Sequence, residues 1–330
     1  MSEANIIPAA SAVTPRTLDE LLDLRLRSEP LLTNQSTITH YRRCVRYFNE
    51  HLGRQALLSD LNAEAIMAWA RSVAEAGFSP ETANAQTKQL KAIWNWAARQ
   101  RIVETFPPVG LKIRCPPPQP KMWSDHELLA MFDAAGKMPG LTGRQNASEY
   151  WTAWLWWGWN TGERTGATLA LTAEMIDWEN GWANVPGEAR KGGMTPMRFI
   201  LSPKCVKALR RLSDRTRPGE PLFDPCDACG HAIYRGWAKL MDLAGIEKVP
   251  RSTIPAQRMR QTVATRIEKR GGTPSVWLGH TPHQVYERHY RDGFEIMLAE
   301  HEKGVWPLDY IGSEPRGKGW GIRRIFKKEA

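Results

Sequence analysis

The feature that most constrains the fold is a proline-rich stretch about one third of the way along the chain. This stretch, residues 106–120, contains six prolines: Pro107, Pro108, Pro116, Pro117, Pro118 and Pro120. Proline lacks a backbone N–H and clashes with the preceding helical turn, so the stretch can form neither a helix interior nor a central strand. We therefore expect residues 106–121 to be a semi-rigid, extended linker between two domains.

The part of the chain before the linker shows only helical periodicity. Thr17, with Glu20 three residues later, is typical of a helix start. Three further apolar stripes at helical spacing follow, over residues 36–52, 62–76 and 80–101. We expect a small four-helix domain over residues 16–105. The preceding residues 1–15 are small, polar and proline-containing, and we expect them to be flexible.

The part after the linker has a mixed pattern. Helices are predicted over residues 124–132, 149–159, 203–212, 232–244, 259–270, 274–278 and 282–290. Three strand-like stretches, residues 175–178, 181–186 and 197–201, are separated by turns at Glu179–Gly181 and Lys191–Gly193. We expect an α+β chain, with a mainly helical domain carrying a small antiparallel sheet over residues 122–312 and a basic tail over residues 313–330.

Five tryptophans crowd the helix predicted over residues 149–159. They are Trp151, Trp154, Trp156, Trp157 and Trp159. Such side chains can stack on nucleic-acid bases, but we favour core packing for them, because aromatic residues dominate buried cores.

The charge of the chain favours an anionic partner. The formal net charge is +10 and the pI is about 9.5. The excess is +5 over residues 16–121 and +4 over residues 313–330. Basic proteins attract nucleic acids through counterion release. The candidate phosphate contacts in the first domain are Arg42, Arg43, Arg46, Lys88 and Lys91. An ordinary solvated helix face explains these five residues equally well.

Several protein classes are disfavoured. The chain has no apolar run of the ~18 residues that a membrane span requires, and it begins with no secretory signal pattern. The five cysteines are scattered, which indicates a reducing compartment and a cytoplasmic location. Cys226 and Cys229 form a lone Cys-x-x-Cys pair, which we interpret as reduced thiols, since structural zinc needs four ligands. Phosphate-loop, dinucleotide-binding and zinc-protease motifs are absent, so we expect no metal and no cofactor.

The informative feature is a dispersed set of polar motifs after the linker. In order, they are Thr161-Gly162-Glu163-Arg164, then Lys191 in a predicted turn, Gln257-x-x-Arg260, Leu278-Gly279-His280 and Tyr290. Each motif alone is weak. Their order and context resemble the tyrosine recombinase (phage integrase) family over residues 16–312. Leu-Gly-His followed by His289-Tyr290 is the most specific part of the resemblance.

The resemblance implies a fold and an activity. The first domain would be a SAM-like core-binding domain that contacts DNA, and the second a catalytic domain. Together they would embrace double-stranded DNA as a homotetramer assembled on two DNA sites, associated with the nucleoid. The reaction would be site-specific recombination or integration without metal or ATP. Phe294, Met297 and Leu298 would supply an apolar anchor on a neighbouring protomer.

The resemblance also implies a role for each site residue. Tyr290 would attack the scissile phosphate and form a 3′-phosphotyrosyl link. Arg164, Arg260 and His280 would stabilise the charge on the phosphate oxygens. Lys191 would protonate the leaving 5′-oxygen. Gln257 stands where a histidine is usual, and it would position groups by hydrogen bonds because it cannot act as a base.

Two further departures from the family pattern stand out, and other interpretations stay open. Ala167 occupies the position where an acidic residue is common, and the spacing from His280 to Tyr290 is one residue longer than usual. Tyr286, and more weakly Tyr310, are rival nucleophiles. A type IB topoisomerase and a DNA-binding protein that has lost catalysis are rival functions. The biological role, whether phage insertion, element mobility or chromosome maintenance, is left open.

Overall fold

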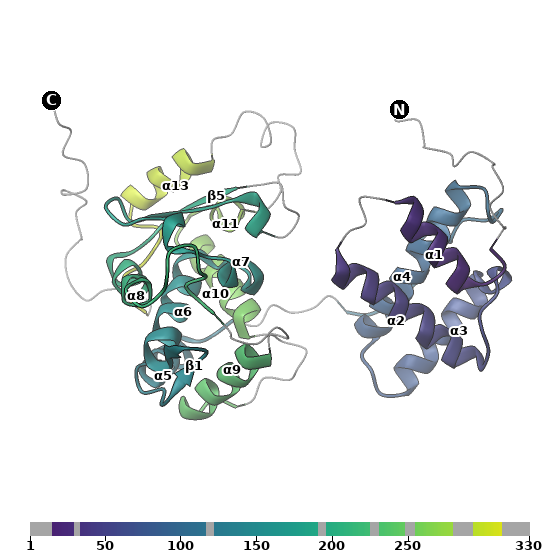
Figure 1. The fold of residues 1–330 in the computed structure, drawn as a ribbon, viewed down its shortest axis with the longest axis horizontal. Coiled ribbons are helices and arrows are strands. Elements are labelled where there is room, and N and C mark those ends of the chain that lie inside the picture. Colours follow the sequence, from purple (N-terminus) through teal and green to yellow (C-terminus); the bar gives the residue numbers. More distant parts are fainter. Residues whose placement is uncertain are drawn as a thin grey trace. The chain divides into compact units, whose positions relative to one another are not determined.

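The structure, a computed structural model, describes seven stretches of the chain. These are residues 15–29, 34–116, 122–190, 196–224, 231–247, 255–279 and 293–311. The predicted flexible N-terminus up to residue 14, the turn at 191–193, the Cys226/Cys229 pair, the helix predicted over 282–290 and the basic tail lie outside these residues. The chain divides into two compact units, Met1–Pro118 and Gln119–Ala330, which are described separately (Figure 1).

The first unit consists of helices whose ends are set by local capping. The helices are α1 (Leu18–Ser28), α2 (Gln35–Leu52), α3 (Ala63–Glu75) and α4 (Pro80–Arg99). Thr17 and Glu20 form the predicted capping box at the start of α1. The side chains of Asn34, Asn62 and Ser79 accept backbone N–H groups at the starts of the other three helices. The four helical predictions are therefore confirmed to within two residues.

The apolar stripes of these helices meet in one core. Its fully buried members include Leu18, Leu21, Val45, Phe48, Ile66, Leu90 and Ile93. Phe48 and Trp69 bring α2 and α3 together with their ring centroids 5.4 Å apart. The periodicity seen in the sequence therefore corresponds to the buried face of each helix.

The first half of the predicted linker lies along α4. Asn84 donates to the carbonyl of Ile113 and accepts its N–H, both at 2.8 Å. Lys91 Nζ donates to the carbonyl of Leu111 at 2.5 Å, and Trp94 Nε1 donates to that of Thr105 at 2.5 Å. Proline-rich chain cannot satisfy its own carbonyls in regular structure, so polar side chains of α4 satisfy them instead. Residues 105–113 are thus fastened to the first unit.

The second unit is mainly helical. Its described helices are α5 (Asp125–Gly136), α6 (Ala147–Thr161), α7 (Thr165–Leu169), α8 (Pro203–Ser213), α9 (His231–Leu243), α10 (Pro255–Lys269), α11 (Pro274–Trp277) and α13 (Gly293–Glu302). The sequence patterns predicted neither α7 nor α13, and they placed the start of α10 four residues too late. In Figure 1, α6 lies in the middle of the unit, between α5, α8 and α10.

Two small antiparallel sheets accompany these helices. Strands β3 (Ile176–Asp177), β4 (Trp182–Val185) and β5 (Met197–Ile200) form a sheet in the order β3-β4-β5. Ile176 pairs with Ala183, and Val185 pairs with Met197. The predicted small antiparallel sheet is confirmed. A further hairpin of β1 (Leu141–Thr142) and β2 (Gln145–Asn146) was not predicted.

The tryptophans of α6 form the centre of the second core. Trp151, Trp157 and Trp159 are fully buried, and Trp154 is 3% exposed. Trp156 is half-buried and lies under the amine of Lys204, 5.5 Å from the ring centroid. Core packing, rather than base stacking, is confirmed for the four buried rings.

The described residues after α11 pack onto their own unit. On α13, Met297 is buried and the Phe294 ring lies 5.3 Å from that of Trp182 on β4. Trp306 donates to the carbonyl of Asn160 at 2.8 Å, with its ring 4.9 Å from that of Trp159. Leu298 also packs against the core, so all three side chains expected to anchor a neighbouring protomer have partners within their own chain in this structure. None of the described helices is both long and apolar enough to cross a membrane.

Candidate active site

The predicted Thr-Gly turn closes the C-terminal end of α6. Gly162 has a left-handed backbone (φ +58°), and its N–H donates to the carbonyl of Gly158 at 2.8 Å. A Cβ at this position would lie 2.6 Å from Cδ2 of Leu278. Both the backbone conformation and the close approach of Leu278 therefore require glycine. The turn directs the chain into Glu163 and Arg164, and Arg164 then begins α7.

Glu163 is a buried carboxylate surrounded by cations. Its side chain is 1% exposed, and Oε2 accepts from Nε of Arg190 at 2.8 Å. Oε1 accepts from the backbone N–H of Arg164 at 2.8 Å and lies 3.9 Å from Nη1 of Arg260. Burying a charge is costly unless opposite charges and hydrogen bonds compensate. Here a single carboxylate compensates for several guanidinium groups.

Arg260 reaches this cluster from α10. Its Nη1 donates to the carbonyl of Gly162 at 2.7 Å, and its Nη2 donates to the carbonyl of Leu278 at 2.9 Å. Burial, together with the positive charge of Arg164, lowers the pKa of Arg260 to about 10, while Glu163 opposes the shift. The structure therefore brings together the two predicted site arginines. The two backbone carbonyls hold Arg260, whereas Arg164 is exposed.

Arg190 joins two further segments to the cluster. Its side chain is 5% exposed, and its Nη2 donates to the carbonyl of Leu278 at 3.3 Å. Gly279 is left-handed (φ +58°), and a Cβ there would lie 2.6 Å from Nη2 of Arg190. The Leu278-Gly279 turn and the chain that follows β4 therefore meet at this buried guanidinium group.

Of the remaining predicted site residues, the structure describes only some. Lys191, His280 and Tyr290, and the rival Tyr286, lie outside the described residues. The described chain reaches Arg190 and Gly279, each one residue before a predicted site residue. Gln257 is exposed on the first turn of α10. Tyr310 is half-buried and packs against the core of the second unit.

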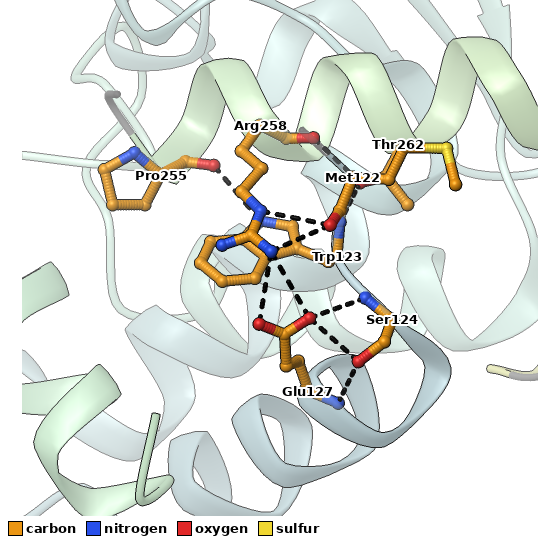
Figure 2. A network of polar contacts seen from close by, with 7 residues as sticks. All are labelled: Met122, Trp123, Ser124, Glu127, Pro255, Arg258 and Thr262. Atoms are coloured by element: carbon orange, nitrogen blue, oxygen red, sulfur yellow. Dashed lines mark hydrogen bonds and ion pairs between the residues drawn. The ribbon is translucent and has the colours of Figure 1, made fainter. Parts of the chain in front are cut away.

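Residues 122–127, at the start of the second unit, contact and stabilise α10, the helix that carries Arg260. Figure 2 shows the guanidinium group of Arg258 stacked on the Trp123 ring, 3.7 Å from its centroid. Arg258 donates from Nε and Nη2 to the carbonyl of Met122, at 3.1 and 2.8 Å, and from Nη2 to Glu127 at 3.2 Å. Glu127 also forms the predicted capping box with Ser124 at the start of α5.

Trp123 completes the connection through its backbone and its indole. Its backbone N–H donates to Oγ1 of Thr262 at 2.8 Å, and its Nε1 donates to the carbonyl of Pro255 at 3.4 Å (Figure 2). Asp125 adds an ion pair with Arg266. Residues 122–127 thus hold α10 at its first three turns, which fixes the rotation of the helix about its axis and hence the direction of Arg260.

Glu163 and Arg190 were not predicted as site residues from the sequence. Both stood beside recognised residues, Glu163 within Thr-Gly-x-Arg and Arg190 directly before Lys191. Nothing local distinguishes them from solvated charges, because their burial arises from segments far apart in the sequence. Ala167, where an acidic residue is common in the family, is buried on α7 and provides no carboxylate.

The candidate DNA contacts of the first unit form two groups. Arg42, Arg43 and Arg46 are exposed on α2, where they contact Asp23, His40 and Glu50 respectively. Lys88 is exposed on α4. Lys91 differs, because its amine donates a hydrogen bond to the carbonyl of Leu111. Burial, and then the charges of the neighbouring Lys112 and Lys88, lower the pKa of Lys91.

The described charges at the site are mainly cationic. Within the described stretches, no three histidine, cysteine, aspartate or glutamate side chains gather in a way that would hold a metal ion. Among the described residues of the cluster, the guanidinium groups of Arg164, Arg190 and Arg260 outnumber the carboxylate of Glu163. Arg164 is exposed, and a guanidinium group matches the oxygens of a phosphate.

The sequence is similar to that of a curated protein. No family model matches the chain. A protein of Pseudomonas aeruginosa assigned as a tyrosine recombinase, XerC, is 26% identical over 257 residues, which make up 69% of this chain and 57% of the relative. The matched region therefore spans just over half of that relative's length.

The fold has counterparts among solved structures. The Tn1549 transposon integrase in complex with circular intermediate DNA aligns with a TM-score of 0.62 and 16% identity, covering 87% of this chain and all of that one. A lambda integrase tetramer bound to a Holliday junction aligns with a TM-score of 0.56 and 16% identity, covering 84% of this chain and 78% of that one. At such identities the likeness concerns the fold.

Proposed function

We propose that this chain, which has the tyrosine recombinase fold and a sequence related to that family, cleaves and rejoins DNA at specific sites. The observation that carries the proposal is the cluster around Glu163. Arg164 and Arg260 meet there, and so do the residues that directly precede Lys191 and His280. Four motifs spread over more than a hundred residues thus converge on one place, as the chemistry of a single phosphate requires.

In the proposed reaction, the phenol of Tyr290 gives its proton to water, its oxygen attacks the scissile phosphorus, and the bond to the 5′-oxygen breaks. Lys191 donates a proton to that oxygen, which leaves as a 5′-hydroxyl. Arg164, Arg260 and His280 stabilise the negative charge that builds on the non-bridging oxygens. The 3′-phosphotyrosyl link conserves the bond energy, so religation to a 5′-hydroxyl of the partner duplex needs no ATP.

Gln257 has a secondary role in the proposal. It is exposed on the first turn of α10, two residues before the buried Met259. An amide donates and accepts hydrogen bonds but does not take up a proton at neutral pH. We expect it to orient the phosphate or Tyr290, so Gln257→Ala slows cleavage without abolishing it. Unchanged cleavage in this variant would contradict the assigned role.

The proposed assembly is a homotetramer on two sites of double-stranded DNA at the nucleoid. The solved lambda integrase complex is a tetramer on a Holliday junction, and it shares this fold. We assign DNA contacts to a core-binding domain over residues 16–105 and chemistry to residues 122–312, with a linker over 106–121 and a basic arm over 313–330.

The experiment begins by finding the DNA site. The full-length protein is incubated with sheared DNA from its source genome, the mixture is denatured, and the DNA that stays covalently attached is sequenced. A duplex carrying the recovered site and a nick beside the scissile phosphate then traps the intermediate. We expect wild type to form an adduct that survives denaturation and Tyr290→Phe to form none.

The same reagents separate the rival functions. A recombinase yields joined products from two duplexes that both carry the site. A topoisomerase would instead relax supercoiled plasmid lacking the site and yield no joined product. A chain that binds the DNA but forms no adduct on any duplex would be a DNA-binding protein without catalysis, and the proposal would be wrong.

A further inference from the structure

The cluster contains an acidic residue that the family resemblance does not provide. The position where an acid commonly follows the first arginine is Ala167, which is buried and apolar. Glu163 instead places a carboxylate immediately before that arginine. We propose that Glu163 is the positioning residue of this site, and that it and Arg190 act as a buried pair that sets the places of the catalytic groups. This inference rests on the proposed function.

The two oxygens of Glu163 serve different segments. Oε2 accepts from Nε of Arg190 at 2.8 Å. Oε1 accepts from the backbone N–H of Arg164 at 2.8 Å and faces Nη1 of Arg260 at 3.9 Å. One rigid carboxylate therefore fixes the backbone that begins α7 and faces the arginine delivered by α10.

Arg190 extends this positioning to two more segments. With 5% of its side chain exposed, Arg190 is too buried to bind DNA phosphate directly. Its Nη2 donates to the carbonyl of Leu278 at 3.3 Å, and Gly279 leaves room for the guanidinium group. Arg190 is joined by a peptide bond to Lys191, and Gly279 to His280. In this proposal the Glu163–Arg190 pair therefore fixes the backbone directly before Lys191 and directly before His280.

The negative charge of Glu163 also matters, because it compensates for the positive charges of the neighbouring arginines. Without Glu163, the guanidinium groups of Arg190 and Arg260 would lose the carboxylate that pairs with both of them. Burial and the charges of Arg164 and Arg190 already lower the pKa of Arg260, and Glu163 opposes this shift. Removing the carboxylate would both loosen the arginines and favour loss of a proton from Arg260.

The test compares three variants on the nicked duplex described above. Glu163→Gln keeps the size of the side chain and removes its charge, whereas Glu163→Asp keeps the charge. Glu179→Gln, in an exposed turn, is the matched control. We expect Glu163→Gln to cut the cleavage rate at saturating DNA about a hundredfold, the usual cost of misplacing catalytic groups. DNA affinity should change less than about threefold, since the contacts that bind the duplex lie elsewhere.

Two further readouts separate positioning from mere folding. The high-pH limb of the cleavage profile should move to lower pH in Glu163→Gln, because Arg260 then loses its opposing charge, and Glu163→Asp should restore most of the rate. If Glu163→Gln does not fold, the double variant Glu163→Gln/Arg190→Met removes both charges, a change that buried pairs often tolerate. We expect the folded double variant to cleave DNA about as slowly as we expect for Glu163→Gln.

The outcomes are distinct. Wild type that forms no adduct refutes the proposed function and this inference with it. If wild type forms the adduct and Glu163→Gln cleaves within about threefold of the wild-type rate, the inference alone is refuted. Misplaced catalytic groups should slow cleavage about a hundredfold. Full cleavage by the double variant also refutes it, because the pair would then only hold the fold.

Discussion

The Thr-Gly turn allows a quantitative test of the site's packing, through Gly162→Ala. A left-handed conformation costs an L-residue roughly 1–2 kcal/mol. The new Cβ would also lie 2.6 Å from Cδ2 of Leu278, a side chain that is 1% exposed and so has little room to move. Overpacking of this kind costs about 1–3 kcal/mol. We therefore expect the variant to lose about 2–5 kcal/mol of unfolding free energy.

Gly245→Ala is the matched control for the backbone contribution. Gly245 is also left-handed (φ +64°) and lies in the same unit, but nothing approaches within 4 Å of its Cβ position. It should lose only the roughly 1–2 kcal/mol of the backbone term. The difference between the two variants therefore isolates the contact with Leu278.

Denaturant unfolding followed by tryptophan fluorescence measures both variants. Twelve of the 15 tryptophans follow residue 118, so the signal is dominated by the second unit. The shift of the midpoint at constant slope gives the change in free energy. Gly162→Ala should also slow cleavage, because Gly162 and Leu278 provide both carbonyls that hold Arg260. Equal destabilisation of the two variants would refute the packing argument.

Three other predictions concern different parts of the chain. Arg258→Met should destabilise the second unit by about 1–3 kcal/mol in the same assay, because Glu127 and the Met122 carbonyl lose their donor; Arg258→Lys should recover only part, and a neutral effect would contradict the role given to this network. Reversing Arg42 and Arg46 to glutamate should weaken DNA binding and flatten its dependence on log salt by about one unit per lost phosphate contact; the exposed Arg71→Glu on α3 is the control, and equal effects would favour a solvated α2 face. Burial lowers the pKa of His301 below 6.5, so its contribution to stability is present above that pH and is lost as the pH falls through the lowered pKa; between about pH 7.5 and pH 5, His301→Asn should therefore lose less unfolding free energy than wild type, and an equal loss would show that His301 has no part in acid sensitivity.

The sequence predicted most helices because their ends and faces are encoded locally. Thr17, Ser79 and Ser124 cap helices that begin where the pattern indicated. The strands around Ala183 were also found, since turn residues bound them on both sides. By contrast, α7 and the β1–β2 hairpin are too short to show a period, and tertiary contacts stabilise them. Helix α13 is longer, with ten residues, but packing of Phe294 and Met297 stabilises it more than a local sequence pattern does.

For the candidate site, the sequence indicated the arginines but not what holds them. Arg164 and Arg260 stand in motifs whose spacing is visible along the chain. Glu163 and Arg190 look like ordinary surface charges, and only the fold shows that they are buried against each other. Neither periodicity nor composition shows that the buried carboxylate of this site belongs to Glu163, directly before Arg164, while position 167 carries alanine.

The most direct test of the account is to identify the residue that carries the DNA. The adduct trapped on the nicked duplex is digested with nuclease and protease, and the peptide bearing a nucleotide is sequenced by mass spectrometry. We expect a 3′-linked nucleotide on Tyr290, and no modified peptide when Arg164 or Arg260 is replaced by alanine. A nucleotide on Tyr286, on Tyr310 or on any other residue would contradict it.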